Sequence, residues 1–245
     1  MNQETGASLP WVRATVKEVV RETADACSFV IEPPASSSAS FSYRPGQFLT
    51  LRLPVAGRYL PRCYSMSSAP SLDALPRVTI KRVSGGRGSN WACDHLRPGS
   101  EIEVLPPAGV FSPKVWNSDF LLLAGGSGIT PIHSILRTAL TTGAGQIHLV
   151  YANRDERSVI FAGELREWAH RYPQRLRITH WLDSIQGVPS VEQLMTLAQG
   201  CAGAQVFICG PGPFMDASVQ ALQSLGWDET LIHVERFVSL PEEDA

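Results

Sequence analysis

Two patterns of hydrophobic and polar residues divide the chain near residue 115. In the first part, short segments rich in β-branched and aromatic residues are separated by Pro-Gly, Gly-Gly and Pro-Pro pairs. Such segments are typical of β-strands, and because no long helical pattern lies between them they predict an antiparallel Greek-key β-barrel. The expected strands are 11–20, 27–32, 47–53, 61–67, 77–83 and 100–105, with a short helix at 88–96 and a solvated loop at 35–40.

The second part alternates strands with helices. Apolar segments are followed by segments with helical spacing of hydrophobic residues, which predicts an α/β doubly wound fold with a parallel five-stranded sheet. We expect strands at 120–124, 147–152, 175–181, 204–209 and 230–235, and helices at 130–142, 157–171, 190–199 and 212–225. A proline and polar residues at 112–117 interrupt both patterns. We therefore place one domain at 1–114 and a second at 115–245, which ends in a short acidic tail.

Charge and composition exclude several classes of protein. The 245 residues carry a formal net charge of −2, which gives no electrostatic reason to bind nucleic acid or an anionic membrane. No apolar run approaches the ~18 residues of a membrane span, and the first ten residues lack the pattern of a secretory signal. We expect a cytoplasmic protein. The five cysteines are scattered without a C-x-x-C pair, so we expect neither a metal site nor a disulfide framework.

A glycine-rich turn follows the first strand of the second domain. Gly125, Gly126 and Gly128 stand between that strand and a helix whose first turn contains Thr130 and Pro131. Glycines let a ligand approach the backbone, and the free N–H groups at a helix N-terminus favour a phosphate. The turn reads G-x-G-x-x-P and lacks the last position of the dinucleotide fingerprint. A plain connection between strand and helix is the alternative.

A second turn, in "FICGPGPFM" at 207–215, also joins an expected strand to an expected helix. Cys209 would lie at the carboxyl end of its strand, beside the first turn, because ligands of open α/β sheets bind at that edge. The alternative for Cys209 is a small, buried hydrophobic residue.

Four motifs in a fixed order resemble the ferredoxin–NADP reductase superfamily. They are "RCYSMSS" (62–68), "GGRGSNW" (85–91), "GGSGITP" (125–131) and "CGPGPFM" (209–215). The detail is most similar to reductase components of multicomponent bacterial oxygenases, namely the 3-ketosteroid 9α-hydroxylase and phenylacetyl-CoA epoxidase reductase groups. The resemblance implies that the barrel binds FAD, that the α/β domain binds NAD(P)H, and that hydride passes from the nicotinamide to the flavin.

The resemblance also assigns residues on the flavin side. Arg62 would pair with the flavin pyrophosphate, Tyr64 would pack against the ring beside Cys63, and Ser65 would act catalytically at the flavin N5 edge. The strand that contains Lys81 and Val83 would line the ring with its backbone. The helix start would hold the pyrophosphate through Gly86, Gly88 and Ser89, whereas Asn90 would either join these residues or cap the helix.

On the nicotinamide side, Gly126, Gly128 and Thr130 match the dinucleotide turn. Cys209, which we expect to be catalytic by placing the nicotinamide, is followed by Gly210 and by Met215 of the same motif. Phe237 would either cover the flavin face or end the last strand as a core residue.

Arg154 and Asp155 follow the second strand of the sheet, where the adenosine ribose of the dinucleotide would lie. Arg154 suits a 2′-phosphate and Asp155 a free 2′-hydroxyl, and a solvated loop is the alternative. We expect NADH to be preferred to NADPH, because the most similar groups commonly use it.

The implied function is an FAD-dependent NAD(P)H reductase that passes single electrons to a separate acceptor, a ferredoxin or an oxygenase component. The chain lacks the C-x₄-C-x₂-C pattern of a plant-type [2Fe–2S] domain, so such a domain is either natively absent or belongs to a longer protein. A reductase for diffusible flavin or quinone, a redox sensor without turnover and a structural domain are the alternatives.

Overall fold

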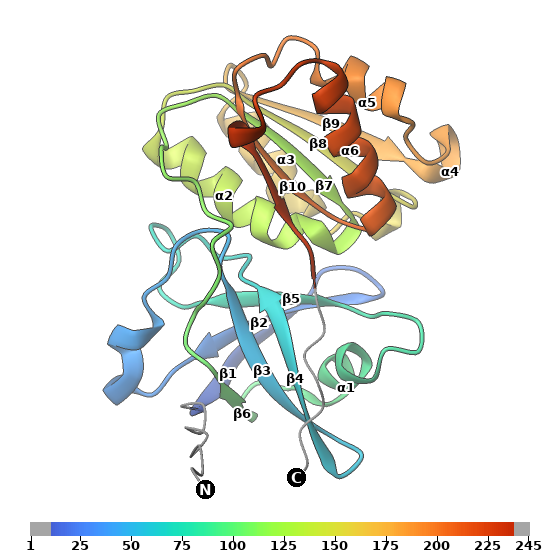
Figure 1. Cartoon of the computed structure of the whole chain (residues 1–245). Helices are drawn as coiled ribbons and strands as arrows, with labels where there is room; N and C mark the ends of the chain where they lie inside the picture. Colours follow the sequence, from blue (N-terminus) through green and yellow to red (C-terminus); the bar gives the residue numbers. More distant parts are fainter. Residues whose placement is uncertain (1–10, 238–245) are drawn as a thin grey trace, which may run out of the picture.

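The computed structural model describes residues 11–237 as a β-barrel with an α/β domain stacked above it (Figure 1). The barrel is one antiparallel sheet in the order β4-β3-β6-β1-β2-β5. Its strands are β1 (Val12–Arg21), β2 (Ala26–Glu32), β3 (Phe48–Val55), β4 (Arg58–Ser65), β5 (Arg77–Lys81) and β6 (Glu101–Val104). The expected antiparallel barrel is confirmed. The first ten residues and the acidic tail lie outside the described residues.

Strand alternation builds the core of the barrel. Leu49, Leu51 and Leu53 of β3 point inward and are fully buried, because successive side chains of a strand face opposite sides of the sheet. A bridge between Met66, directly after β4, and Val78 of β5 joins the two edge strands. The helix α1 (Arg87–His95) covers one end of the barrel.

The segment expected as a solvated loop at 35–40 is instead a 3₁₀ helix, η1 (Ala35–Phe41). Its serine hydroxyls donate to its own backbone, from Ser38 to Ala35 and from Ser40 to Ser37. Phe41 is buried and attaches the segment to the barrel core. The polar composition of this segment predicted a loop, because it gives no sign of the hydrogen bonds from the serines to the backbone or of the contact made by Phe41.

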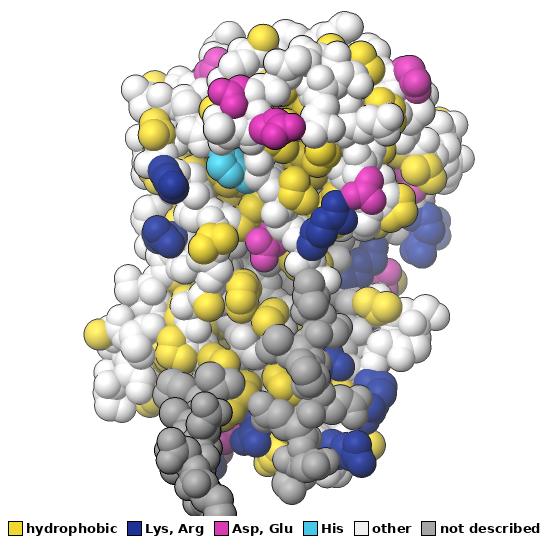
Figure 2. All heavy atoms as spheres, viewed as in Figure 1, with side chains coloured by type: hydrophobic (Ala, Val, Ile, Leu, Met, Phe, Trp, Pro, Cys, Tyr) yellow, Lys and Arg dark blue, Asp and Glu magenta, His cyan; other side chains and the backbone are white. Residues whose placement is uncertain are grey.

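The second domain contains five parallel strands in the order β11-β10-β7-β8-β9, as the doubly wound prediction requires. The strands are β7 (Phe120–Gly125), β8 (Ile147–Asn153), β9 (Leu176–Leu182), β10 (Gln205–Cys209) and β11 (Ile232–Glu235). The helices are η2 (Gly126–Gly128), α2 (Ile129–Thr142), η3 (Glu156–Ser158), α3 (Ala162–Arg171), α4 (Asp183–Gln186), α5 (Val191–Ala198), α6 (Gly212–Ser224) and η4 (Glu229–Leu231). Acidic and basic side chains share the visible surface of this domain (Figure 2), in line with the small net charge.

The helix expected at 157–171 is interrupted, which corrects the prediction. It divides into η3 and α3 because Phe161 has a left-handed backbone, with φ of 62°. The ring of Phe161 is buried and stacks on His133 with 4.3 Å between ring centroids. The short helix α4 was also not predicted, since four residues carry no helical periodicity.

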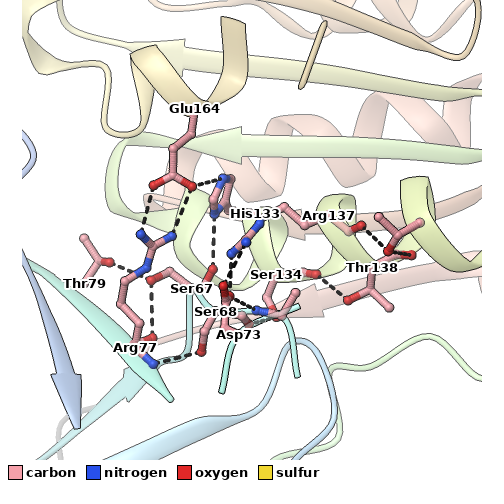
Figure 3. A network of polar contacts seen from close by, with 12 residues as sticks. Ser67, Ser68, Asp73, Arg77, Thr79, His133, Ser134, Arg137, Thr138 and Glu164 are labelled. Carbon is pink, nitrogen blue, oxygen red and sulfur yellow. Dashed lines mark hydrogen bonds and ion pairs between the residues drawn. The ribbon is translucent and has the colours of Figure 1, made fainter. Parts of the chain in front are cut away.

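A network of polar contacts, here called the interdomain network, joins the barrel to α2 and α3 (Figure 3). Arg77 of β5 donates to both carboxylate oxygens of Glu164, at 2.9 and 3.3 Å. Arg137 of α2 does the same to Asp73, at 2.6 and 3.0 Å. Burial alone would raise the pKa of Asp73, but the hydrogen bonds from Arg137 hold it below its ordinary value. Two-pronged pairs of this kind fix direction as well as distance.

His133 of α2 completes the network at its centre. Its Nδ1 lies 3.1 Å from the backbone oxygen of Ser67, and its Nε2 lies 3.4 Å from a carboxylate oxygen of Glu164. Burial lowers the pKa of His133 to about 4, and the positive charges of Arg77 and Arg137 add to this effect while Glu164 opposes it. His133 is therefore neutral at pH 7, and Nδ1 carries the proton that it donates to Ser67.

We predict that this histidine makes the fold sensitive to acid. An unfolded histidine binds a proton near pH 6.5, well above the folded pKa of about 4, so stability is lost as pH falls between these values. The His133 contribution to the free energy of unfolding should fall by about 2 kcal/mol between pH 7 and pH 5. Urea unfolding at both pH values should show a smaller drop for His133→Gln than for the wild type. Equal drops would show that His133 does not titrate as described.

Candidate functional site

The barrel and the second domain together enclose a cavity of about 300 Å³, here called the interdomain cavity. Most of the residues that the sequence motifs single out line it. These are Arg62, Cys63, Tyr64, Ser65, Lys81, Val83, Gly86, Gly88, Ser89, Thr130 and Phe237. Thr79, Arg87 and Ser127 also line the cavity and were not predicted. Thr79 could have been found, because it lies two positions before Lys81 and so shares a face of the strand.

Strand β4 presents the R-x-Y-S motif to this cavity. The Arg62 guanidinium lines the wall and donates to the carbonyl of Pro61 at 2.8 Å. Burial raises the pKa of Tyr64, so its phenol stays protonated. A Cβ atom on Gly88 would lie 3.2 Å from Cγ of Arg62 and 3.7 Å from the Tyr64 hydroxyl. The first turn of α1 is thus packed directly on the two side chains.

The beginning of α1 forms the next part of the wall. Gly86 is the N-cap residue, and a Cβ atom there would lie 2.8 Å from the hydroxyl oxygen of Ser89. That hydroxyl accepts a hydrogen bond from the backbone N–H of Val83 at 3.1 Å. Of the two roles considered for Asn90, capping of the helix is wrong, because Asn90 lies inside the helix, where its side chain donates to the Val83 carbonyl at 3.1 Å. Asn90 therefore ties the segment after β5 to α1 and lies outside the cavity wall described above.

The two glycine turns of the second domain are in backbone contact. A Cβ atom on Gly128 would lie 2.1 Å from the carbonyl oxygen of Cys209, and one on Gly210 would lie 3.0 Å from Cα of Gly125. Gly126 has a φ of 51°, and a Cβ atom there would lie 4.0 Å from Nζ of Lys81. The glycine turn thus meets both the end of β10 and the barrel strand β5.

Cys209 lies at the carboxyl end of β10, as expected, but its side chain is fully buried in the core and does not line the interdomain cavity. Burial raises the pKa of its thiol, so it is not a reactive thiolate. Glu235 of β11 lies opposite Cys209 in the strand pair, and burial raises its pKa as well. The sequence motifs did not reveal Glu235. Met215 is buried in the core on the other face of the sheet.

Arg154 and Asp155 directly follow β8 at the carboxyl edge of the sheet. Asp155 accepts from the backbone N–H and hydroxyl of Ser158, and Arg154 contacts a carboxylate oxygen of Asp155 at 3.2 Å. The hydrogen bonds from Ser158 lower the pKa of Asp155, so it is ionised at neutral pH. Both residues are therefore held in one ordered turn, outside the wall of the interdomain cavity.

The cavity offers what a flavin and a nicotinamide require. Two helix N-termini, the arginines Arg62 and Arg87 and the glycines Gly86 and Gly88 favour diphosphates. The hydroxyls of Ser65 and Thr79 suit ring nitrogens and oxygens. In the part of the chain that the structure describes, no group of three His, Cys, Asp or Glu residues is suitable for a metal ion. None of the helices described is long and apolar enough to cross a membrane. These features define a protein that binds two nucleotides for redox chemistry.

Comparison with known proteins agrees with this class. Residues 13–112 match the oxidoreductase FAD-binding domain family, and residues 122–220 match the oxidoreductase NAD-binding domain family. The ferredoxin reductase component of 3-ketosteroid-9-alpha-monooxygenase from Rhodococcus rhodochrous is 54% identical over 92% of this chain and 65% of its own length. A component of the 1,2-phenylacetyl-CoA epoxidase from Escherichia coli is 36% identical, over 91% and 67% of the two chains.

A solved structure supports the same arrangement. The flavohem-like FAD/NAD-binding domain of nitric oxide dioxygenase from Vibrio cholerae has a TM-score of 0.79 and 27% identity, over 92% of this chain and 98% of that domain. The chain therefore belongs to the FAD- and NAD-binding oxidoreductases of the ferredoxin reductase family, as the resemblance of its motifs implied. It spans about 65% of the length of the 3-ketosteroid-9-alpha-monooxygenase reductases that it matches.

We predict that Gly128 tolerates no side chain. The Cβ atom of Gly128→Ala would meet the Cys209 carbonyl, and the resulting shift should lower the free energy of unfolding by about 3 kcal/mol. The matched control is Gly163→Ala, because Gly163 lies in α3 with nothing within 4 Å of an added Cβ. Urea unfolding should show the control to be neutral or stabilised by about 0.5–1 kcal/mol. A Gly128→Ala protein as stable as the control would contradict the close approach of the two turns.

Proposed function

We propose that this chain is an FAD-dependent NAD(P)H reductase. It transfers hydride from NAD(P)H to FAD and then passes single electrons to a separate protein, a ferredoxin or an oxygenase component. The observation that carries the proposal is the interdomain cavity, onto which the R-x-Y-S strand, the start of α1 and the glycine turn all open. The names of the relatives, which are reductase components of oxygenases, support the acceptor class.

The barrel residues bind the flavin in this proposal, within the domain that we place at 1–114. Arg62 and the N-terminus of α1, at Gly86, Gly88 and Ser89, hold its diphosphate. The Tyr64 ring packs against the flat ring system beside Cys63, while the Ser65 hydroxyl donates to or accepts from the N5 edge. Bound FAD supplies the hydride-accepting chemistry, and these residues supply binding and orientation.

The second domain, which we place at 115–245, binds the nicotinamide dinucleotide. Its diphosphate lies over Gly126, Gly128 and the N-terminus of α2, close to Thr130. Cys209 and Gly210 place the nicotinamide ring in this proposal. Because the Cys209 thiol is fully buried, we propose a positioning role for Cys209 and no covalent catalysis.

The remaining residues of the two motifs have supporting roles. Met215 supports the second turn from within the core. Phe237, which is about half exposed at the cavity, covers the flavin face.

The proposed donor is NADH rather than NADPH. Arg154, the candidate for a 2′-phosphate, is already bonded to Asp155 and Ser158. Asp155 is an ionised carboxylate at the same place, which accepts from a free 2′-hydroxyl and repels a phosphate. A cytoplasmic location stays a prediction from the sequence.

Anaerobic titration of the purified protein tests the function and the donor together. We expect a yellow protein whose flavin absorbance is bleached by one equivalent of NADH, and by NADPH only at concentrations at least about 10-fold higher, since one repulsive contact costs about 1.4 kcal/mol or more. Subsequent addition of ferricyanide should restore the absorbance. A protein that releases its flavin would instead be a reductase of diffusible flavin, and bound flavin that NADH does not bleach would indicate a sensor without turnover.

We predict that Arg62→Ala weakens FAD binding by about 10- to 100-fold, because a charge-assisted hydrogen bond to phosphate contributes about 1.5–3 kcal/mol. Flavin content after dialysis measures the effect. Arg13→Ala is the matched control, since Arg13 lies on β1 of the same barrel and forms an exposed ion pair with Glu101, at 3.7 Å. Equal flavin retention by both variants would exclude Arg62 from the diphosphate site.

A further inference from the structure

A chain of three hydrogen-bonded side chains leads from the interdomain cavity to the turn between β1 and β2. Thr79 lines the cavity, and its hydroxyl lies 2.8 Å from the hydroxyl of Ser28 on the neighbouring strand. The Ser28 hydroxyl lies 2.5 Å from a carboxylate oxygen of Glu22. Thr79 and Ser28 are almost fully buried, whereas Glu22 is only partly buried and so reaches solvent.

Strand geometry places the Thr79 hydroxyl on the cavity face. Thr79, Lys81 and Val83 all line the cavity, while Val78 and Ile80 between them point into the barrel core. This alternation follows from the two-residue period of a strand. Ser28 is paired with Thr79 in the β2–β5 register, so its side chain lies on the same face.

The number of protons in the chain makes the direction of its hydrogen bonds depend on Glu22. Each hydroxyl has one proton to donate. When Glu22 is ionised, Ser28 must donate to it, so Thr79 must donate to Ser28 and offers the cavity only a lone pair. When Glu22 is protonated, it donates to Ser28 and Ser28 donates to Thr79, so the Thr79 proton is released toward the cavity or toward Ser67, whose hydroxyl lies 2.7 Å away.

We propose that Glu22, Ser28 and Thr79 form a proton relay that compensates charge in the interdomain cavity. The inference rests on the proposed function. Hydride transfer brings two electrons and one proton, so it adds one negative charge to the ring in the cavity. That charge favours the arrangement in which the Thr79 hydroxyl donates its proton toward the cavity. Because this arrangement requires a protonated Glu22, Glu22 then takes up one proton from solvent. No bond other than the O–H bond of Glu22 forms, because Ser28 and Thr79 only rotate their hydroxyl groups.

The surroundings of Glu22 suit this role. Burial, and to a lesser extent the negative charge of Glu164 on α3, raise its pKa above the ordinary range of a glutamate, against the hydrogen bond from Ser28 and the positive charge of Arg77 on β5. Tyr151 of β8 is a further titratable group near Glu22, and burial keeps its phenol protonated. Asp25 lies in the same turn as Glu22 and is paired with Lys81 at 3.8 Å. A negative charge in the cavity would shift the Glu22 equilibrium further in the same direction, toward the protonated form.

Proton uptake during flavin reduction tests the relay. Reduction of bound FAD by NADH consumes no solvent proton, because the donor delivers its hydrogen as hydride. In weakly buffered solution with a pH indicator, we expect the wild type to bind a measurable fraction of a proton per FAD beyond any uptake by the flavin itself. Glu22→Gln should lose this uptake. Glu18→Gln, on the exposed face of β1, is the matched control and should keep it.

A second pair of variants separates a relay through the hydroxyl groups from a direct electrostatic effect of the added negative charge on Glu22. Ser28→Ala keeps the Glu22 carboxyl but cuts the chain, and it should lose most of the uptake, whereas Thr79→Ser keeps the hydroxyl and should retain it. Unchanged uptake in either Glu22→Gln or Ser28→Ala would overturn the relay, and each variant decides the question if the other fails to fold. If NADH does not reduce the bound flavin, the proposed function fails. Photoreduction of the same variants then still decides the relay, since its proton balance is common to all of them.

Discussion

The interdomain cavity depends on charge pairs that hold the two domains at one distance and angle. Arg77 with Glu164, and Arg137 with Asp73, each connect one domain to the other through two hydrogen bonds. Buried ion pairs contribute little net stability, because removing both charges from water costs about as much as their attraction returns. Their value here is directional, since a shifted or rotated interface would leave a charge buried without its partner.

The histidine between these pairs, His133, further restricts how the two domains can be positioned relative to each other. The imidazole of His133 donates to the backbone of Ser67 and stacks on Phe161, so the segment after β4 is fixed relative to α2. Ser134 adds a further bond, from its hydroxyl to the Ser68 carbonyl at 2.5 Å. Because Ser67 and Ser68 directly follow the R-x-Y-S motif, the contacts that join the domains also position the strand that faces the cavity.

Local patterns predicted the two sheets and most of the cavity wall. The alternation of buried and exposed residues in a strand, like a glycine turn, involves residues that are close together in the chain. Both can therefore be recognised in a single sequence. The interdomain network could not be predicted in this way, because its hydrogen-bonded partners across the two domains lie 64 to 87 residues apart and a single arginine on a strand resembles a solvated one. Ser28 was missed for the same reason, since Thr79 lies 51 residues away. The break at Phe161 depends on tertiary stacking against His133, which overrides the helical pattern around it.

The rim of the cavity gives an independent reason to expect a flat ring inside it. Val83 is 61% exposed and Phe237 is 48% exposed, although both line a concave site. Exposed apolar side chains that gather at a cavity mark a surface that a ligand covers. The cavity is also lined by the hydroxyl-bearing side chains of Ser65 and Thr79. A ligand that is apolar on its faces and polar along its edges can cover the exposed apolar side chains and also form hydrogen bonds with the hydroxyl groups. A purely polar or a purely apolar ligand can do only one of these.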